Sequence, residues 1–465
     1  MKPMPLSLVA SVVHGELNAP ARECAALFVQ GFAVDSRNIG NGDLFVAIEG
    51  ERVDGHAFVT SAVEAGALAA LVSREVEGAP CLIVSDPVAA LGEFAAWYRQ
   101  EILEATVIGI TGSSGKTTTK DLIAEVLDGE VVAAHGSFNT EVGLPLSIVS
   151  ATETTQYLVL EMGMRGLGHI RYLAELAKPD IGVVLNVGSA HVGMMDDPSD
   201  IARAKAELVQ SLSVDGNAVL NADDPQVAAM ADQTDAAITW FGTGSGVEVA
   251  ATDIEVGNDG CPSFALRIAD GETIPVSLTL HGEHFVESAL AAAAVGHLCG
   301  MTAPRIAEKL NSARARSRWR MEVHTTRRGV TVICDAYNAN PESMRAALKA
   351  LRSMGQGRRT WAVLGEMREL GELSVDEHDA IGRLAVRLDI SRLVCVGPGT
   401  KVMHLAASNE GSWGEESQWV EDAQAAMDLL DRELAPGDVV LVKASRAVGL
   451  EVIAEHLLDS DRLAS

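Results

Sequence analysis

The sequence predicts an α/β protein built from three domains. At roughly 100–200 residues per domain, a chain of 465 residues corresponds to two to four domains. Two long stretches alternate apolar strand candidates with helix candidates, which is typical of parallel sheets covered by helices. A shorter mixed stretch precedes them. We therefore expect a small N-terminal α/β domain over residues 1–103, a central domain over 104–320 and a C-terminal domain over 321–465.

The N-terminal domain is predicted from short apolar runs separated by turn residues. Residues 43–50 (DLFVAIEG) have the composition of a strand. A longer apolar run then predicts a helix over residues 54–72. Together these elements describe a small α/β unit.

The central domain is predicted to begin with a strand, a glycine-rich loop and a helix. The strand covers residues 105–110 (ATVIGI), and the helix follows the loop TGSSGK. Further strands are expected at 157–163 and 181–188, each followed by a helix. Residues 251–280 predict a β-meander, and the alanine-rich segment that follows predicts a buried helix. The pattern is that of a mainly parallel sheet.

The strand–helix alternation restarts in the C-terminal domain. Strands are predicted at VTVICDA, TWAVLGE, RLVCVG and DVVLVKAS, and helices at PESMRAALKAL, HDAIGRLAVRL, EDAQAAMDLLDREL and VGLEVIAEHLL. This order gives the domain a Rossmann-like character.

Composition excludes several classes of protein. The 36 Lys and Arg against 64 Asp and Glu give 36 − 64 = −28, which argues against a nucleic-acid or anionic-membrane binder. The sequence contains no apolar run of the roughly 20 residues that span a membrane, and its first residues do not resemble a signal peptide. Six scattered cysteines indicate reduced thiols, not disulfides or a zinc site. We expect a cytoplasmic protein.

The strongest functional signal is the loop after the first central strand. It comprises Gly112, Ser113, Ser114, Gly115, Lys116, Thr117 and Thr118. Backbone amides in such a loop surround phosphate oxygens, the lysine reaches the terminal phosphates, and the first threonine suits Mg²⁺. Ile110 stands where the longer GxxxxGK[ST] pattern has glycine, so the loop is a shorter variant of this phosphate loop, or P-loop. No Asn-Lys-x-Asp signature is present, which favours ATP over GTP and makes the central domain a candidate ATPase domain.

Candidate metal ligands follow the neighbouring strands. Glu161 ends one strand and His191 lies just beyond the next, where the carboxyl ends of parallel strands meet. Asp223 and Asp224 form a weaker pair that is equally well explained by capping the turn at Pro225. Lys205, on the following helix, would by itself be interpreted as a surface lysine, because a protonated ammonium repels Mg²⁺.

Several motifs together resemble the Mur ligases, ATP-dependent amide-forming enzymes of peptidoglycan synthesis. They are TGSSGKTTTK, LEMGMRGLGHI, NVGSAHVG, AKAE, SRWRMEV, DAYNANP and VKASRAVGLE, in family order across nearly the whole chain. The segments SFNTEVGLPLSI (137–148) and LGEMRELGELSVDEH (364–378) are similar to the branch that adds D-Ala-D-Ala to UDP-N-acetylmuramoyl-tripeptide.

The resemblance implies a reaction in two steps. The free carboxylate of UDP-N-acetylmuramoyl-tripeptide takes the γ-phosphoryl group of ATP and becomes an acyl phosphate, and the amine of D-Ala-D-Ala then displaces phosphate. Phosphorylation is needed because a carboxylate is a poor electrophile, and cations offset the repulsion between the two anions. The expected partners are these two substrates, with the chain acting as a monomer.

The resemblance also assigns residues. Lys116 contacts the β- and γ-phosphates, Thr117 and Glu161 hold one Mg²⁺, and His191 and Lys205 hold a second, with Lys205 carbamylated by CO₂. Arg320 and Asp335 match positions that hold ATP. The positions nearer the incoming amine and phosphate are Asn338, Asn340, Lys443, Ser445 and Arg446.

In the N-terminal domain, Ser36 and Arg37 match the part of the family that binds the uridine diphosphate sugar, whereas Asp54-Gly55-His56 is equally well a helix cap. The sequence departs from the family in two places. Phe285 or Ser288 stands where an asparagine commonly meets adenine, and Asn139 is followed by Thr140 in place of a second asparagine.

Three alternatives remain open at the level of sequence. The sibling ligase that adds a diamino acid or lysine to the dipeptide carries a DNPR-type motif, where this chain has GEMRELGE. A folylpolyglutamate synthetase would lack the N-terminal domain. A P-loop ATPase switch would carry a strand-end aspartate, where this chain has Glu161.

Overall fold

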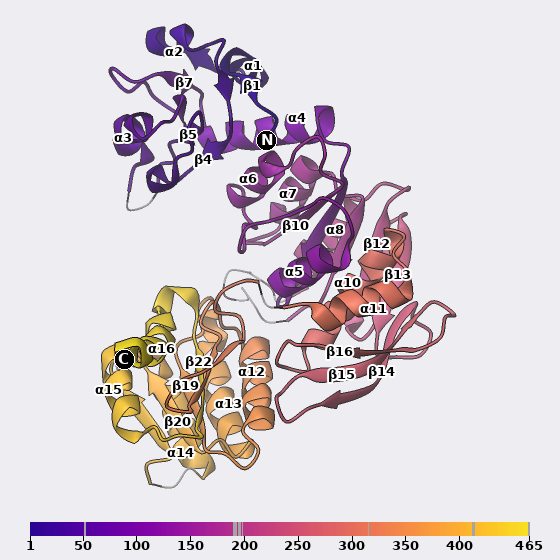
Figure 1. Cartoon of the computed structure of the whole chain (residues 1–465), viewed down its shortest axis with the longest axis vertical. Helices are drawn as coiled ribbons and strands as arrows, with labels where there is room; N and C mark the ends of the chain where they lie inside the picture. Colours follow the sequence, from indigo (N-terminus) through magenta and orange to yellow (C-terminus); the bar gives the residue numbers. More distant parts are fainter. Residues whose placement is uncertain are drawn as a thin grey trace.

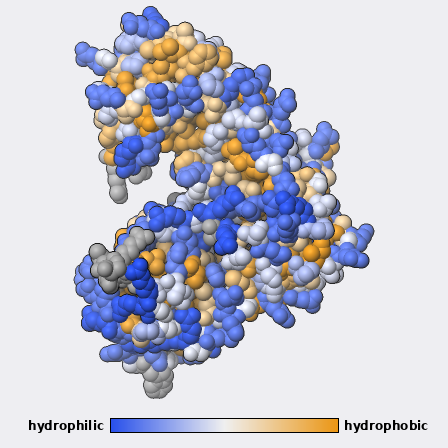
Figure 2. Space-filling model, viewed as in Figure 1, coloured by the Kyte–Doolittle hydropathy of each residue, from blue (hydrophilic) through white to orange (hydrophobic). Residues whose placement is uncertain are grey.

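The computed structural model describes residues 1–50, 53–188, 193, 197, 199–314, 316–411 and 414–463. Over these residues the chain forms three α/β domains in sequence order, which confirms the predicted fold class (Figure 1). The surface is hollowed between the N-terminal and the C-terminal domain, which both extend from the central one (Figure 2). The described part of the chain has no helix that is both long and apolar enough to cross a membrane.

The N-terminal sheet has the strand order β2-β7-β6-β5-β4, with β2 antiparallel to β7 and the other pairs parallel. Its strands are β2 (Glu16–Leu17), β4 (Phe32–Ala33), β5 (Leu44–Val46), β6 (Ala69–Val72) and β7 (Cys81–Ile83), and β1 (Met4–Pro5) pairs with β3 (Phe28–Val29). Its helices are α1 (Leu6–Val12), α2 (Ala19–Glu23), α3 (Val59–Glu64) and α4 (Pro87–Glu101). Helix α4 packs on the central domain through α6 and α7.

The helix predicted over residues 54–72 is wrong in its second half. A 3₁₀ turn covers Gly55–Phe58 and α3 ends at Glu64, whereas Ala69–Val72 is the fully buried strand β6 between β5 and β7. A short apolar run does not distinguish a buried parallel strand from a buried helix, because neither has a polar face.

The central sheet has the order β16-β15-β14-β13-β12-β11-β8-β10-β9 and is parallel except for the meander β14-β15-β16. Its strands are β8 (Thr106–Thr111), β9 (Val131–Ala133), β10 (Tyr157–Glu161), β11 (Ile181–Val184), β12 (Asn217–Asn221), β13 (Ala237–Gly242), β14 (Val249–Val256), β15 (Pro262–Ile268) and β16 (Ile274–Ser277). The predicted meander is confirmed, whereas β9, β12 and β13 were not predicted.

Two layers of helices cover the central sheet. Helices α5 (Lys116–Val126), α10 (Phe285–Leu298) and α11 (Ala303–Ser312) pack together, and α10 is the predicted alanine-rich buried helix. A second layer contains α6 (Gly143–Ser150), α7 (His169–Ala177) and α8 (Ser199–Gln210), and the short helix α9 (Pro225–Ala228) follows β12. Strands buried on both faces explain the continuous apolar runs in the sequence.

The C-terminal sheet has the order β17-β18-β22-β19-β20-β21, with β17 antiparallel to β18. Its strands are β17 (Glu322–Thr325), β18 (Thr331–Cys334), β19 (Thr360–Leu364), β20 (Arg392–Val396), β21 (Ser417–Val420) and β22 (Val439–Lys443). Helices α12 (Pro341–Met354), α13 (Ser374–Arg387) and α14 (Lys401–Glu410) form one layer, and α15 (Ala423–Glu433) and α16 (Glu451–Leu463) the other. Along β22, Val440 and Val442 enter one core and Val439 and Leu441 the other.

Candidate functional site

The phosphate loop connects β8 to α5 as predicted. Gly115 precedes the helix with φ of +80°, a left-handed conformation that favours glycine. The helix begins at Lys116, so its first backbone amides have no partner within the helix and face the loop. The Lys116 Nζ donates to the Gly112 carbonyl at 2.5 Å. The loop therefore presents amides and one cationic side chain to the same volume, which suits a polyphosphate.

An acid and a hydroxyl meet beside this loop. Glu161 ends β10, which pairs directly with β8, so its carboxylate lies next to α5. Thr117 Oγ1 donates to Glu161 Oε2 at 2.7 Å, and Asn139 Nδ2 donates to Glu161 Oε1 at 2.7 Å. The Glu161 side chain is buried. The structure thus brings together the oxygen donors that the sequence proposed for Mg²⁺.

Lys205 is buried inside the central domain without a carboxylate contact among the described residues. Its residue exposure is 1%, and the polar contact of its Nζ is the Met164 sulfur at 3.9 Å. Burial and the positive charge of Lys116 lower the pKa of Lys205 well below its ordinary value, although Asp224 acts in the opposite direction. The interpretation as a surface lysine is therefore wrong, and the side chain is a buried amine whose burial favours the uncharged form.

The second metal position stays a prediction. His191 lies outside the described residues, so its distance to Lys205 is not defined by the structure. Among the residues that are described, no group of three or more His, Cys, Asp or Glu side chains is placed to hold a metal ion. Asp224 caps α9 by accepting from Gln226 N and Val227 N, which fits the capping explanation for this aspartate.

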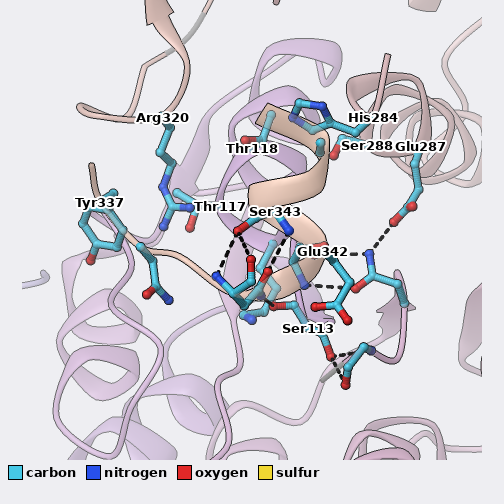
Figure 3. A pocket seen from close by; sticks show the side chains of 18 of the residues that line it. Ser113, Thr117, Thr118, His284, Glu287, Ser288, Arg320, Tyr337, Glu342 and Ser343 are labelled. Atoms are coloured by element: carbon cyan, nitrogen blue, oxygen red, sulfur yellow. Dashed lines mark hydrogen bonds between the residues drawn. The ribbon is translucent and has the colours of Figure 1, made fainter. Parts of the chain in front are cut away.

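The phosphate loop lines a cavity of about 480 Å³ between the central and the C-terminal domain (Figure 3). Its central-domain wall includes Glu161, Asn186, His284, Phe285, Glu287 and Ser288, together with the loop residues from Ser113 to Thr118. Its opposite wall includes Arg320, Asp335, Tyr337, Asn338, Asn340, Glu342, Ser343 and Lys443. The cavity is therefore shared between two consecutive domains, and its lining residues extend from Ser113 to Lys443 in the sequence.

The C-terminal wall carries an ion pair between the buried Lys443 and the partly buried Asp335. The Lys443 Nζ donates to Asp335 Oδ2 at 2.6 Å and to the Asn338 carbonyl at 2.8 Å. Lys443 ends β22 and Asp335 follows β18, so the pair sits at the carboxyl edge of neighbouring parallel strands. This edge is where ligands bind in open α/β sheets.

Contacts across the domain boundary close the cavity. Asn340 Nδ2 donates to the Ser113 carbonyl at 3.2 Å, and Ser137 Oγ is hydrogen-bonded to the Tyr337 hydroxyl. The Arg320 guanidinium lies over the Tyr337 ring, 4.2 Å from its centroid. Figure 3 shows the two side chains next to each other. The C-terminal domain therefore contacts the phosphate loop itself.

Several predicted site residues lie elsewhere. Ser445 is buried in the C-terminal domain, where its Oγ accepts from Arg368 N and donates to the Ala339 carbonyl. Arg446 pairs with Glu451 and stacks on Trp319. In the N-terminal domain, Ser36 begins a 3₁₀ turn and the exposed Arg37 pairs with Asp35 at 2.7 Å, away from this cavity. Their contacts with ligands stay predictions.

Sequence reasoning missed Tyr337, Asn186 and Glu287, and it named Phe285 and Ser288 as departures whose adenine contact was in doubt. Phe285 and Ser288 do line the cavity, and the rings of His284 and Phe285 are 4.1 Å apart. Asn186 belongs to the motif NVGSAHVG, but nothing in the sequence singled it out as a residue of the site. Its Oδ1 accepts from Ser114 N at 2.9 Å and its Nδ2 donates to Glu287 Oε1 at 2.6 Å.

Glu287→Gln is expected to remove a pH-dependent loss of stability. Desolvation raises the pKa of Glu287 from 4.5 to about 7, with Asp224 and Asp223 adding to the rise and the Asn186 hydrogen bond opposing it. The folded chain thus keeps a proton that the unfolded chain loses between pH 4.5 and 7, so the unfolding free energy falls as pH rises through this window. The glutamine variant should be more stable than the parent by roughly 1–3 kcal/mol at pH 8 and equal at pH 4.

Denaturant unfolding at both pH values tests this expectation. The exposed Glu283→Gln, on the same segment, is the matched control and should change neither value. If the unfolding free energies of Glu287→Gln and the parent differed by the same amount at both pH values, the raised pKa of Glu287 would be contradicted.

The site as a whole defines a class of enzyme: a P-loop nucleotide-dependent enzyme whose two α/β domains share one cavity. The chain belongs to the Mur ligase family, whose members are ATP-dependent ligases. Three models of the family match the chain. They are "Mur ligase family, catalytic domain" over residues 29–123, "Mur ligase middle domain" over 110–296 and "Mur ligase, glutamate ligase domain" over 319–446.

Relatives and solved structures agree with this assignment. The chain is 45% identical to the UDP-N-acetylmuramoyl-tripeptide–D-alanyl-D-alanine ligase of Mycobacterium leprae, with 97% of both chains covered. It is similar to the UDP-N-acetylmuramoylalanyl-D-glutamyl-2,6-diaminopimelate–D-alanyl-D-alanyl ligase of Acinetobacter baumannii (TM-score 0.84, 28% identity, 99% of each chain). It is also similar to the MurF ligase of Thermotoga maritima solved in complex with ADP (TM-score 0.80, 29% identity, 94% of this chain and 99% of that one).

Proposed function

We propose that this enzyme joins D-Ala-D-Ala to UDP-N-acetylmuramoyl-tripeptide, using ATP and forming UDP-N-acetylmuramoyl-pentapeptide, ADP and phosphate in peptidoglycan precursor synthesis. The observation that carries the proposal is the cavity in which the phosphate loop faces the Lys443–Asp335 pair of the second domain. The near-full-length identity with ligases of this name supports the substrates. The similar structure of a UDP-N-acetylmuramoyl-L-alanyl-D-glutamate–2,6-diaminopimelate ligase is 18% identical, so that similarity informs the fold alone.

The chemistry proceeds by phosphoryl transfer and then acyl transfer. An oxygen of the tripeptide carboxylate attacks the γ-phosphorus, the bond to the β–γ bridging oxygen breaks, and ADP leaves. The amine of D-Ala-D-Ala then attacks the acyl carbon of the mixed anhydride, phosphate leaves with its oxygen, and the amine releases a proton. Lys116 and the loop amides hold the phosphate charge where it develops, which is the main contribution that a protein makes to such a transfer.

The residues present fit a magnesium-bound nucleotide. Thr117 Oγ1 and Glu161 Oε2 converge at 2.7 Å beside the loop, and hydroxyl and carboxylate oxygens are the ligands that Mg²⁺ accepts. When bound there, the ion would neutralise phosphate charge. A second ion would be held by His191 and by Lys205 as a carbamate. Supporting this, Lys205 is buried with a lowered pKa, and an uncharged amine is the form that reacts with CO₂.

Each domain has a role in the proposal. We assign UDP-sugar binding to residues 1–103, with Ser36 and Arg37 as contacts, ATP to 104–320, and D-Ala-D-Ala to 321–465. Arg320 and Asp335 serve the nucleotide, and Asn338, Asn340, Lys443, Ser445 and Arg446 serve the incoming amine and phosphate. We also propose that the chain acts as a monomer and works in the cytoplasm, and its six free cysteines together with ATP use support that compartment.

Phosphate release tests the function directly. We expect release from ATP and Mg²⁺ when UDP-N-acetylmuramoyl-tripeptide and D-Ala-D-Ala are both present, with a product heavier by the dipeptide less water, and near silence when either is omitted. Release with neither substrate would support an ATPase switch. Release with the UDP-dipeptide and a diamino acid, but not with D-Ala-D-Ala, would support the sibling ligase.

A further inference from the structure

Two loops run side by side away from the Glu161 carboxylate. One follows β10 and leads to α7, and the other contains Asn139 and leads to α6. Besides the bond from Asn139 Nδ2 to Glu161, the backbone amide of Gly163 donates to the Asn139 carbonyl at 2.8 Å. A Cβ on Gly163 would lie 3.0 Å from Asn139, so the two loops are in close contact at this point. These contacts position the side chains further along the two loops relative to the Glu161 carboxylate.

A cluster of three charged or titratable side chains lies further along both loops. Arg165 Nη1 donates to Glu141 Oε1 at 2.9 Å, and His169 Nε2 lies 3.2 Å from Glu141 Oε2. The Arg165 amide donates to His169 Nδ1 at 3.1 Å, which places the imidazole proton of a neutral ring on Nε2, facing Glu141. Partial burial alone would raise the pKa of Glu141, but a backbone hydrogen bond and the charges of Arg165 and His169 lower it.

The cluster keeps spare binding capacity. The Arg165 side chain is 64% exposed and that of Glu141 is 31% exposed. A guanidinium has five N–H donors, and within the described residues one hydrogen bond from the Arg165 side chain, to Glu141, is formed. The remaining donors can pair a carboxylate bidentately, while the Glu141 oxygens can accept from an ammonium. A zwitterionic amino-carboxylate is the ligand that uses both.

The buried anchor of the loops is independent of this cluster. Glu207, on α8, accepts from Gly168 N at 2.6 Å and from Arg171 N at 3.0 Å, and its side chain is buried. The buried Glu207 carboxylate on α8 therefore holds the first residues of α7 in place. The pair of Arg165 and the half-buried Glu141 contributes little to holding the loop by comparison, since solvent-accessible ion pairs add little to stability.

The reach from the reaction centre matches a diamino-dicarboxylic acid. Glu141 is two residues beyond Asn139, so their Cα atoms are separated by at most about 7 Å. In 2,6-diaminopimelate six C–C bonds of about 1.52 Å join the two carboxyl carbons, which spans up to about 8 Å when extended. The two lengths are similar, so a substrate whose reacting carboxylate lies beside Glu161 and Thr117 is long enough to extend its distal amino-carboxylate toward Glu141.

We propose that Arg165 and Glu141 form a specificity site for the third residue of the peptide, with Arg165 binding the distal carboxylate of a diamino-dicarboxylic acid and Glu141 its ammonium. The inference rests on the proposed function, because it concerns the UDP-tripeptide. It selects diaminopimelate over lysine, which carries the distal ammonium but has no carboxylate for Arg165. His169 acts as a positioning residue that holds Glu141.

Three UDP-tripeptides test the site with the full-length enzyme, ATP, Mg²⁺ and D-Ala-D-Ala. They end in diaminopimelate, in lysine, and in diaminopimelate whose distal carboxylate is converted to the amide. For the parent enzyme kcat/KM is expected to be about 10–100-fold higher with free diaminopimelate than with either other substrate, mainly through KM. Arg165→Gln should reduce kcat/KM for diaminopimelate to near the value for lysine and leave the lysine value unchanged.

Controls separate specificity from structure. Arg165→Lys keeps the positive charge and should recover part of the preference. Arg305→Gln removes a half-exposed arginine that pairs with Asp128 and should retain the parent's preference. Equilibrium binding of the UDP-tripeptides without ATP, together with the melting temperature of Arg165→Gln, shows whether an effect belongs to recognition or to folding.

The outcomes distinguish this inference from the function on which it rests. Ligation of no tripeptide would overturn the proposed function. Ligation of all three with equal kcat/KM would overturn the specificity site alone. A fall in kcat/KM for Arg165→Gln that is equal for diaminopimelate and lysine would also overturn it, because Arg165 would then support the loops or contact another part of the substrate.

Discussion

Alanine in place of Lys116 is expected to reduce ligation by about 1,000-fold or more, because the phosphate loop loses the cation that meets the developing charge. In the structure its Nζ is held by the Gly112 carbonyl within the loop. Desolvation lowers the pKa of Lys116, and the positive charge of Arg320 adds to this, while Glu161 opposes it. An anionic polyphosphate would act in the same direction as Glu161 and favour the ammonium form.

Phosphate release with both substrates present measures this loss. Lys349→Ala, which removes an exposed lysine from α12, is the control and should retain the parent's rate. Normal turnover in Lys116→Ala would be incompatible with the loop as the phosphate site.

Lys205→Ala should cause a loss of similar size, but for a different reason. The buried amine lacks a carboxylate contact in the described structure, and burial lowers its pKa, which favours the uncharged form that reacts with CO₂. Its carbamate would supply the oxygen ligand that an ammonium cannot. Acetate or formate should therefore restore part of the activity of the alanine variant, by entering the space that the side chain leaves.

The same hypothesis has a spectroscopic test. The parent enzyme in ¹³C-labelled bicarbonate should show a carbamate carbon signal, which Lys205→Ala should lack and Lys349→Ala should retain. Full activity of Lys205→Ala without any added carboxylate would exclude the carbamate as a required group.

The parts of the site that sequence reasoning predicted well are those fixed by local structure. The phosphate loop is contiguous, and its place between β8 and α5 follows from one strand–loop–helix pattern. Glu161 was found because parallel strands end at one edge, and register pairs it with Ile110 directly before the loop. Both inferences need no knowledge of how distant domains meet.

The parts that were missed depend on contacts between domains or on burial. Tyr337 reaches Ser137 across 200 positions of sequence, and no local pattern reports such a contact. Lys205 by itself was interpreted as a surface lysine because a protonated ammonium repels Mg²⁺. The sequence of its helix does not reveal how deeply the polar side of the helix is covered. Ser445 follows Lys443 by two positions, yet the chain has left β22 there and its hydroxyl turns to Ala339.

The helix error in the N-terminal domain has a related cause. Residues 69–72 form a strand because β5 and β7 flank them on both sides, and these partners lie outside the window in which hydrophobic periodicity is measured. The predicted fold class was still correct, because it depends on the alternation of strands and helices over the whole chain.

Asn340 shows how narrowly one position can be constrained by two neighbours. Its Oδ1 accepts from the Ser343 amide and caps α12, while its Nδ2 donates to the Ser113 carbonyl in the other domain. Aspartate or serine would cap the helix equally well, but neither has an amide N–H to offer the phosphate loop. A substitution at this position can thus preserve the folding of the C-terminal domain and still remove the contact of that domain with the phosphate loop. Selection for stability acts on the Oδ1 atom of Asn340, and selection for catalysis acts on its Nδ2 atom.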